Sequence, residues 1–420
     1  MTPHTPPAKR RRSTASGTAI PEDILVTEVL ARLPVRSLLR FRSVCRSWRA
    51  AIDDPSFVRR HLQLSRGRTS SVLDVPCEPR LEDYWGEARS KELEFRRIRH
   101  GVRRQGETAA VTAELMHAMV WPANRVTAVM DPVHCDGMVL VPTASGELFV
   151  CNPATREFVA LPPGSPGVQE AVAFGFDPCS NAYKVARIFV RQTEFDEPDE
   201  SDSDDEGGGR WEIDGIGNEV FTLGAGSWEP TDDPPYYVAP IRPICTRGAF
   251  YWTAVVGAGC ADDPPPTELL RFCLRDETFT VVPNPPCFSQ SSQKIIGERD
   301  TLTELGGKLC CAHARTPTGV DIWLADDGPR PEWSVAYRFE LLRPIVEFVL
   351  PLAADGDELL LSVDRRMLYK YNATSKALDV VVDMQRAPDL YGARPPLPLR
   401  LIHHAVPYVE SLVSIGRHNY

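Results

Sequence analysis

Proline is unusually frequent in this chain and is spread along nearly all of it. There are 38 prolines among 420 residues. Each proline removes a backbone N–H donor and clashes with the preceding helical turn, so long uninterrupted helices are disfavoured. The pattern favours many short strands separated by turns. Hydrophobic residues at 43% and charged residues at 25% are ordinary for globular proteins, so most of the chain is expected to fold.

Composition also narrows the setting. No run approaches the roughly 20 apolar residues that span a bilayer, and the first residues lack the apolar stretch of a secretory signal. We therefore expect an intracellular protein, in the nucleus, the cytoplasm or both, with no membrane partner. The 11 cysteines are odd in number, which favours free thiols used as small core side chains. A net charge of −10 argues against nucleic-acid binding.

Residues 1–18 are polar, lack apolar periodicity and are expected to be a disordered basic tail. Within them lies the cluster Lys9-Arg10-Arg11-Arg12. Such a cluster is typical of a nuclear import signal, but it also fits a merely solvated tail. Both interpretations stay open.

The region 19–64 is the most helical part of the sequence. Val26, Val29, Leu30 and Leu33 follow the i, i+3, i+4, i+7 spacing of one apolar helix face. Pro34 ends that helix.

Further short helices are expected after this proline. Ser43 is the predicted cap of the helix that carries Trp48, and Asp54-Pro55 is expected to cap and start the next one. A unit of about 45 residues cannot bury so many large apolar side chains by itself. Either a partner covers the excess, or the rest of the chain does.

These residues resemble the F-box. The matching segments are Ile20-Pro21-Glu22-Asp23-Ile24-Leu25, Leu33-Pro34-Val35, Ser37-Leu38, Arg42-Ser43-Val44-Cys45-Arg46-Ser47-Trp48-Arg49 and Asp54-Pro55-Ser56-Phe57. The resemblance implies docking on a Skp-type adaptor, which joins cullin and RING subunits. It implies as adaptor-binding candidates, without separating contacts from the module's own core, Pro21, Ile24, Leu25, Leu33, Pro34, Val35, Leu38, Val44 and Trp48.

From about residue 66 to 415 the pattern changes to short apolar runs broken by turn residues. Hairpins are predicted at 146–162, 268–283 and 367–381. A spacing near 45–50 residues per four-stranded unit is that of propeller blades. We therefore expect a small all-α module followed by an all-β domain, an irregular β-propeller with six to eight blades.

This β region is similar to the plant F-box-associated domain, which is kelch-like. The similarity rests on Cys135-Asp136-Gly137-Met138, on Asn152-Pro153-Ala154-Thr155-Arg156-Glu157, on Phe174-Gly175-Phe176-Asp177-Pro178 with Tyr183-Lys184-Val185, and on the strand leading to Trp228. It implies that the domain captures an unknown protein substrate for ubiquitin-dependent degradation. Trp228, Tyr236, Tyr237 and Trp252 are candidates as exposed aromatic residues, although core packing is favoured for Trp252.

An acidic, serine- and glycine-containing stretch at 194–209 is expected to be a disordered loop between strands. It is either an inert insertion or a functional segment that contacts a basic partner or is phosphorylated at Ser201 or Ser203.

An enzymatic role is the remaining alternative, since propellers can host hydrolases. No nucleophile elbow, H-E-x-x-H pair or phosphate-binding glycine loop occurs. Cys310-Cys311 with His313, and His403-His404, lack metal-ligand spacing, and no ligand or cofactor is assigned. The hypotheses are thus a non-catalytic ubiquitin-ligase substrate receptor, a non-degradative adaptor-bound scaffold, and a propeller enzyme.

Overall fold

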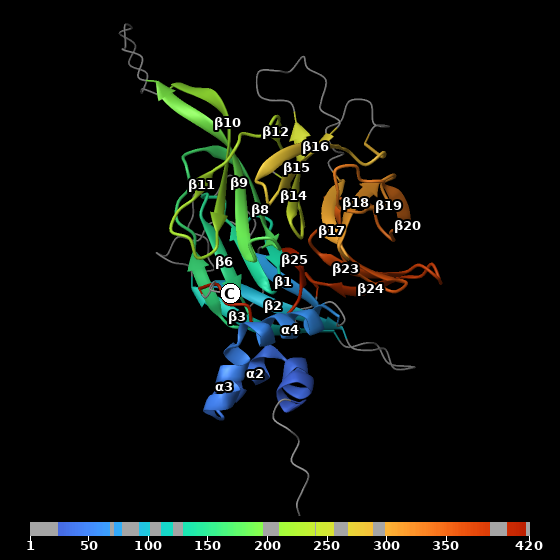
Figure 1. Ribbon diagram of the computed structural model, residues 1–420. Coiled ribbons are helices and arrows are strands. Elements are labelled where there is room, and N and C mark those ends of the chain that lie inside the picture. Colours follow the sequence, from blue (N-terminus) through green and yellow to red (C-terminus); the bar gives the residue numbers. More distant parts are fainter. Residues whose placement is uncertain are drawn as a thin grey trace, which may run out of the picture.

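The protein combines a small helical module with six antiparallel sheets arranged in a ring (Figure 1). The computed structural model describes residues 24–67, 71–77, 92–100, 111–120, 129–195, 210–239, 241–255, 268–288, 299–386 and 401–416. The basic tail 1–18 therefore lies outside the described residues. Among the described residues, no helix has the length and apolar character needed to cross a lipid bilayer.

The helical module begins with a π-helical turn and a 3-10 turn, followed by three short α-helices. Their bounds are Leu25–Val29 (η1), Leu30–Arg32 (η2), Val35–Phe41 (α2), Arg46–Asp53 (α3) and Pro55–Arg66 (α4). Pro34 is extended, with φ −60° and ψ 148°, and so separates η2 from α2 as predicted. Asp54 caps α4 by accepting the Ser56 N–H at 2.8 Å, which is also as predicted.

The expected cap of α3 is wrong. Cys45, not Ser43, is the N-cap, and its Sγ accepts the Trp48 N–H at 3.4 Å. The Ser43 hydroxyl instead donates to the Arg40 carbonyl oxygen at 2.6 Å. Ser43 thus lies in the turn that follows α2, and α3 starts three residues later at Arg46.

Each sheet forms one blade of a propeller, so the blade count is six. Blade 1 contains β1 (Ser71–Cys77), β2 (Glu92–His100), β3 (Val111–Val120) and β25 (Ile402–Tyr408); blade 2 contains β4 (Val133–Cys135), β5 (Met138–Pro142), β6 (Leu148–Asn152) and β7 (Glu157–Ala160); blade 3 contains β8 (Val168–Asp177), β9 (Ala182–Phe195), β10 (Arg210–Thr222) and β11 (Glu229–Pro230).

Blade 4 differs in that its innermost strand is split in two. It contains β12 (Tyr237–Val238), β13 (Ile244–Thr246), β14 (Ala249–Val255), β15 (Glu268–Cys273) and β16 (Thr278–Pro283); blade 5 contains β17 (Thr301–Leu305), β18 (Lys308–Ala314), β19 (Gly319–Ala325) and β20 (Ser334–Glu340); blade 6 contains β21 (Val349–Asp355), β22 (Glu358–Val363), β23 (Met367–Asn372) and β24 (Leu378–Asp383).

The ring closes through the C-terminal strand. β25 pairs antiparallel with β1, from Ser71 opposite Tyr408 to Cys77 opposite Ile402. The innermost strands then contact one another in the order β25, β4, β8, β13, β17, β21 and back to β25. Hydrophobic clusters fill all six spaces between neighbouring blades. Every blade is therefore held on both faces.

The three predicted hairpins are confirmed as β6–β7, β15–β16 and β23–β24. Each turn contains one residue with a left-handed backbone, namely Arg156 (φ 64°), Glu277 (φ 53°) and Lys376 (φ 59°). In the first two, the N–H of that residue donates to the last strand carbonyl at 2.8 Å. The same turn geometry thus recurs in different blades.

The expectation that the loop begins at residue 194 is wrong for its first two residues. Glu194 and Phe195 still belong to β9 and pair with Trp211 and Arg210 of β10. Residues 196–209 lie outside the described residues.

The two faces of the ring are distinguished by which turns they carry. Turns after the first and third strand of each blade lie on the side of the helical module, which we call the helix side. Loops after the second strand, and the linkers between blades, lie on the opposite side, which we call the far face. Arg66 of α4 pairs with Asp136 in the β4–β5 turn, which fixes this assignment.

Candidate docking surface and its support

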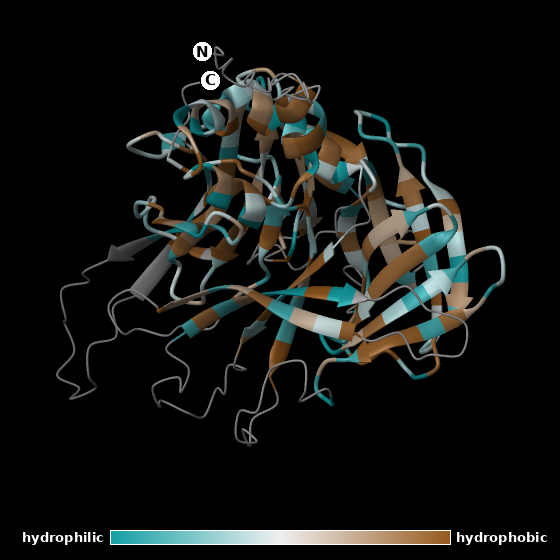
Figure 2. Cartoon of the chain, turned by 90° about the horizontal axis from the view of Figure 1, so that it is seen from below, coloured by the Kyte–Doolittle hydropathy of each residue, from teal (hydrophilic) through white to brown (hydrophobic). Residues whose placement is uncertain are grey.

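The helical module is packed firmly on the propeller. Leu30, Val35, Leu38 and Ile52 are at most 1% exposed and belong to one hydrophobic cluster with side chains of blades 2 and 3. Hydrophobic residues, brown in Figure 2, run along the helices and the adjoining strands. The rest of the chain therefore buries much of the apolar excess noted in the sequence.

A segment that follows β25 completes this cluster. Residues 409–416, which we call the C-terminal strap, contribute the buried side chains of Leu412, Val413 and Ile415. The side-chain amide of Asn152 donates to the carbonyl oxygens of Ser411 at 3.2 Å and Val413 at 2.7 Å. The strap is thus fixed to the β6–β7 hairpin of blade 2.

Glu410 connects the strap to both the module and blade 1. Its Oε1 accepts the Val35 N–H at 3.1 Å, at the start of α2, where helix N–H groups lack partners. Its Oε2 accepts the Arg97 guanidinium at 2.7 Å. Glu114 also binds Arg97, at 2.9 Å. The Glu410 carboxylate therefore orients α2 relative to the propeller.

His134 lies where the strap leaves the ring. Its Nε2 lies 3.0 Å from the Gly137 N and 3.3 Å from the Val409 N, so it accepts both N–H groups and carries no proton there. Burial lowers the pKa of His134 to about 4, Asp136 opposes this shift, and Arg66 adds to it. The strap is consequently held by a neutral imidazole.

The residues expected to bind an adaptor separate into three groups. Pro21 lies outside the described residues. Val35 and Leu38 are fully buried, and Leu33 and Trp48 are partly buried against the same core. These four therefore build the module. Ile24 and Val44 are 50% and 61% exposed, Pro34 is exposed, and Leu25 is half-buried, which leaves these residues accessible to a partner.

Val29 was missed as a candidate. It is 43% exposed, although the helical spacing places it on the same face as the buried Leu30. The π-helical turn Leu25–Val29 changes the angular position of its residues, and sequence spacing gives no signal of such a turn. The accessible apolar surface therefore comprises Ile24, Leu25, Val29, Pro34 and Val44.

Two exposed arginines flank Val44 in the sequence. Arg40 and Arg46 are exposed and form no ion pair with any described residue, whereas Arg42 pairs with Asp53 at 2.6 Å. A hollow of about 380 Å³ lies between α2 and α3, lined by Leu39, Arg42, Ser43, Arg49 and Asp53. A partner with apolar anchors and an acidic rim fits this surface.

The aromatic residues named as substrate candidates are placed differently. Trp252 is 1% exposed and packs between blades 3 and 4, as favoured from the sequence. Trp228 is half-buried rather than exposed: it packs against the module's cluster, and its indole N–H donates to the Pro162 carbonyl at 2.8 Å. Tyr237 is half-buried and Tyr236 is 41% exposed.

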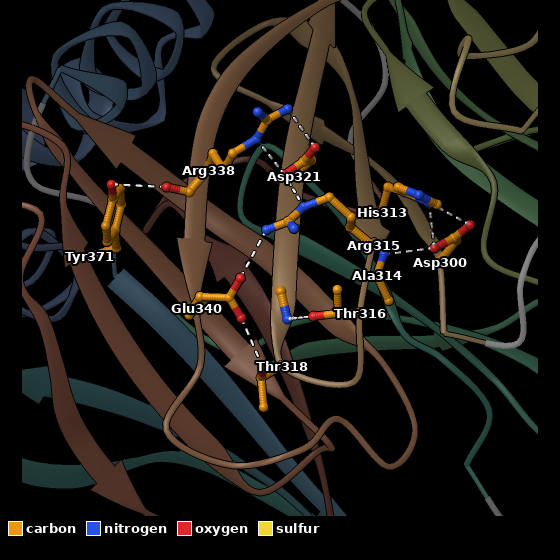
Figure 3. A network of polar contacts seen from close by, with 11 residues as sticks. Asp300, His313, Ala314, Arg315, Thr316, Thr318, Asp321, Arg338, Glu340 and Tyr371 are labelled. Carbon is orange, nitrogen blue, oxygen red and sulfur yellow. Dashed lines mark hydrogen bonds and ion pairs between the residues drawn. The ribbon is translucent and has the colours of Figure 1, made fainter. Parts of the chain in front are cut away.

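The cysteine and histidine pairs have structural partners. Cys310 and Cys311 are both buried on opposite faces of β18, in the blade 5–6 and blade 4–5 cores respectively. Figure 3 shows His313 Nδ1 against both Asp300 oxygens, each at 3.1 Å. His403 and His404 bind Asp74 at 3.0 Å and Asp131 at 3.2 Å. Within the described part of the chain, no three such residues gather as metal ligands.

Two family matches cover the two parts of the chain. Residues 19–60 match the F-box domain, and residues 102–363 match the F-box associated beta propeller domain. A putative F-box protein of Arabidopsis thaliana is 26% identical over 404 residues, covering 94% of this chain and 100% of the relative. An F-box/LRR-repeat protein of the same plant is 24% identical, covering 91% of this chain and 84% of the relative.

Among solved structures, an oligogalacturonate lyase in complex with manganese covers 70% of this chain and 74% of that chain. The TM-score is 0.37 and the identity 11%, a likeness too small to bear on fold or activity. The family match, in contrast, spans most of the propeller and agrees with the observed blades. The chain belongs to the F-box proteins that carry an F-box associated β-propeller domain.

Proposed function

We propose that this chain is the non-catalytic substrate receptor of a Skp–cullin–F-box ubiquitin ligase. The helical module docks on a Skp-type adaptor, the adaptor joins cullin and RING subunits, and the propeller captures a protein target. Ubiquitin transfer takes place on the other subunits, so this chain acts by raising the local concentration of its target.

One observation carries this proposal. The propeller and the strap bury the core of the module, yet Ile24, Val29 and Val44 remain 50%, 43% and 61% exposed. Exposed apolar side chains concentrated in one small module are typical of an interaction surface. Full burial of such a side chain contributes about 1.5–3 kcal/mol, so covering three half-exposed ones contributes about 3 kcal/mol. Arg40 and Arg46, which form no ion pair with any described residue, add selectivity for an acidic partner.

The proposal is tested by replacing exposed residues rather than deleting the module, because deletion would uncover the propeller core. Ile24→Glu combined with Val44→Glu places negative charge on the docking surface without touching the core. We expect adaptor affinity, measured by calorimetry with a purified Skp-type adaptor, to fall at least tenfold. Val380→Glu on β24 is the matched control, because Val380 is 49% exposed and lies on the propeller. Unchanged affinity of the double variant contradicts the proposal.

The same double variant separates a degradative receptor from a non-degradative scaffold. A receptor that cannot dock leaves its targets stable, so proteins bound by the propeller accumulate when the variant replaces the wild type. A scaffold binds the same proteins without changing their abundance. Quantitative proteomics of both cell lines distinguishes these outcomes.

A further inference from the structure

Exposed apolar side chains are distributed unequally between the two faces of the ring. The blade-to-blade linkers on the far face present Met130, Tyr236, Ile241, Leu342 and Val346, which are 47%, 41%, 43%, 68% and 74% exposed. In the described turns of the helix side, no large hydrophobic residue is exposed to this degree. The far face therefore has the apolar character of an interaction surface.

The centre of this face contains a charge cluster. Asp131 lies in the linker that enters blade 2, and Arg242 lies in the linker that enters blade 4; the two are 3.6 Å apart. Because blade 3 separates these linkers along the ring, the pair lies over the central opening. Asp131 also binds His404 of β25 and Arg365 of blade 6, both at 3.2 Å. One carboxylate is thus shared among three basic side chains.

Arg242 is the member of this cluster whose donors are least used. Its side chain is only 13% exposed, and its one polar contact among the described residues is the 3.6 Å approach to Asp131, with no hydrogen bond. Arg365 has two 3.2 Å bonds to Asp131, and its Nε lies 3.8 Å from Glu347. A guanidinium carries five N–H donors, so Arg242 has capacity for a further acceptor.

Blade 5 shows how the chain satisfies an arginine that serves only its own fold. Arg338 makes two 2.9 Å hydrogen bonds to the buried Asp321, and Arg315 bridges Asp321 and Glu340 at 3.2 and 2.9 Å (Figure 3). Arg242 lacks such an arrangement although it is less exposed than either. Ile241, which precedes Arg242 in the sequence, and Met130, which precedes Asp131, are both about half exposed.

We propose that the far face binds a protein segment whose Asp or Glu side chain accepts hydrogen bonds from Arg242, while flanking apolar side chains pack on Met130 and Ile241. This inference deepens the proposed function, on which it rests for the role of the propeller in target capture. A carboxylate fits better than a phosphate because Asp131, 3.6 Å from Arg242, repels a dianion more strongly than a monoanion. The ligand class is therefore an acidic residue within an apolar segment.

The experiment uses the full chain and a displayed library of random twelve-residue peptides. We expect the wild type to enrich peptides with Asp or Glu beside apolar residues, and Arg242→Gln to lose this enrichment. Selected peptides, measured by fluorescence polarisation, should bind Arg242→Gln at least tenfold more weakly. Arg275→Gln on the helix side is the matched control, because Arg275 is exposed and, among the described residues, forms an ion pair with Asp276 alone. Ile241→Glu, at an exposed position, should also lose binding while its thermal unfolding stays unchanged.

Several results would overturn the inference. One is the absence of any enrichment, and another is acidic enrichment that survives Arg242→Gln. A third is tighter binding of phosphoserine peptides than of the Asp or Glu peptides. The fourth is enrichment seen only after deletion of residues 196–209, which would assign Arg242 to the chain's own acidic segment. Adaptor affinity is measured on the same samples. Failure of adaptor docking with intact peptide binding refutes the proposed ligase role and leaves the far-face site standing, whereas the reverse result refutes the site alone.

Discussion

The neutral imidazole of His134 makes the attachment of the C-terminal strap sensitive to acid. We consider the variant His134→Gln, whose amide oxygen can accept the same Gly137 and Val409 N–H groups but does not titrate. In the wild type, protonation of Nε2 removes both hydrogen bonds, which are 3.0 and 3.3 Å long, and places a charge in a buried site.

The size of the effect follows from the shift in pKa. The pKa of His134 is lowered in the folded state from 6.5 to about 4, first by burial. Above pH 6.5 the residue is neutral in both states, so it adds no pH dependence. Below pH 6.5 the unfolded chain takes up the proton first, and stability falls by about 1.4 kcal/mol per pH unit until the folded pKa is reached. Between pH 7.5 and pH 5 the loss is about 2 kcal/mol.

The measurement is urea unfolding of both proteins between pH 7.5 and pH 5, followed by tryptophan fluorescence. Other titrating groups, such as His404 with its lowered pKa and His313 with its raised pKa, change both proteins alike and cancel in the difference. We expect the wild type to lose about 2 kcal/mol more than His134→Gln over this range. A difference that stays constant with pH would refute the reasoning, because it would mean that His134 is not held neutral by burial.

Three further predictions concern the strap and the tail. Gly137→Ala should destabilise the protein by about 2 kcal/mol or more in thermal unfolding, because Gly137 has φ +90° and an added Cβ would lie 2.4 Å from the Ser411 Oγ; wild-type stability would contradict this. Glu410→Gln should cost about 2 kcal/mol in urea unfolding, because a charge-assisted hydrogen bond to Arg97 is lost; an unchanged midpoint would show that Glu114 suffices. Replacing 9–12 by alanines should move a fluorescent fusion from nucleus to cytoplasm if these residues direct import, and an unchanged distribution would assign them to a solvated tail.

Local sequence signals predicted the elements whose causes are local. The hairpins at 146–162, 268–283 and 367–381 were predictable because each places turn residues between two short apolar runs. The cap at Asp54 was predictable for the same reason. Cys45 was missed as a cap because a thiol is a weak acceptor and is rarely chosen over the nearby Ser43.

Long-range features had no comparable signal. The blade count depended on the pairing of β25 with β1, two strands separated by almost the whole chain. Glu410 contacts Val35 across 375 residues of sequence, so no local pattern linked them. Val35 and Leu38 matched the F-box motif, but their burial required knowledge of the propeller and strap side chains that belong to the same cluster. The helical module was therefore predicted as a unit, and which of its apolar side chains are exposed only became clear from the fold.

The position of the strap has a consequence for how the protein is made. The helical module is synthesised before the propeller, whereas Leu412, Val413 and Ile415, which belong to the same hydrophobic cluster, follow the strand that closes the ring. On the ribosome, the module must wait for nearly the entire chain before it can reach its final packing. A product of premature termination lacks these strap residues and exposes apolar side chains of the module to chaperones and proteases. We therefore expect a truncated chain to be degraded faster than the complete protein.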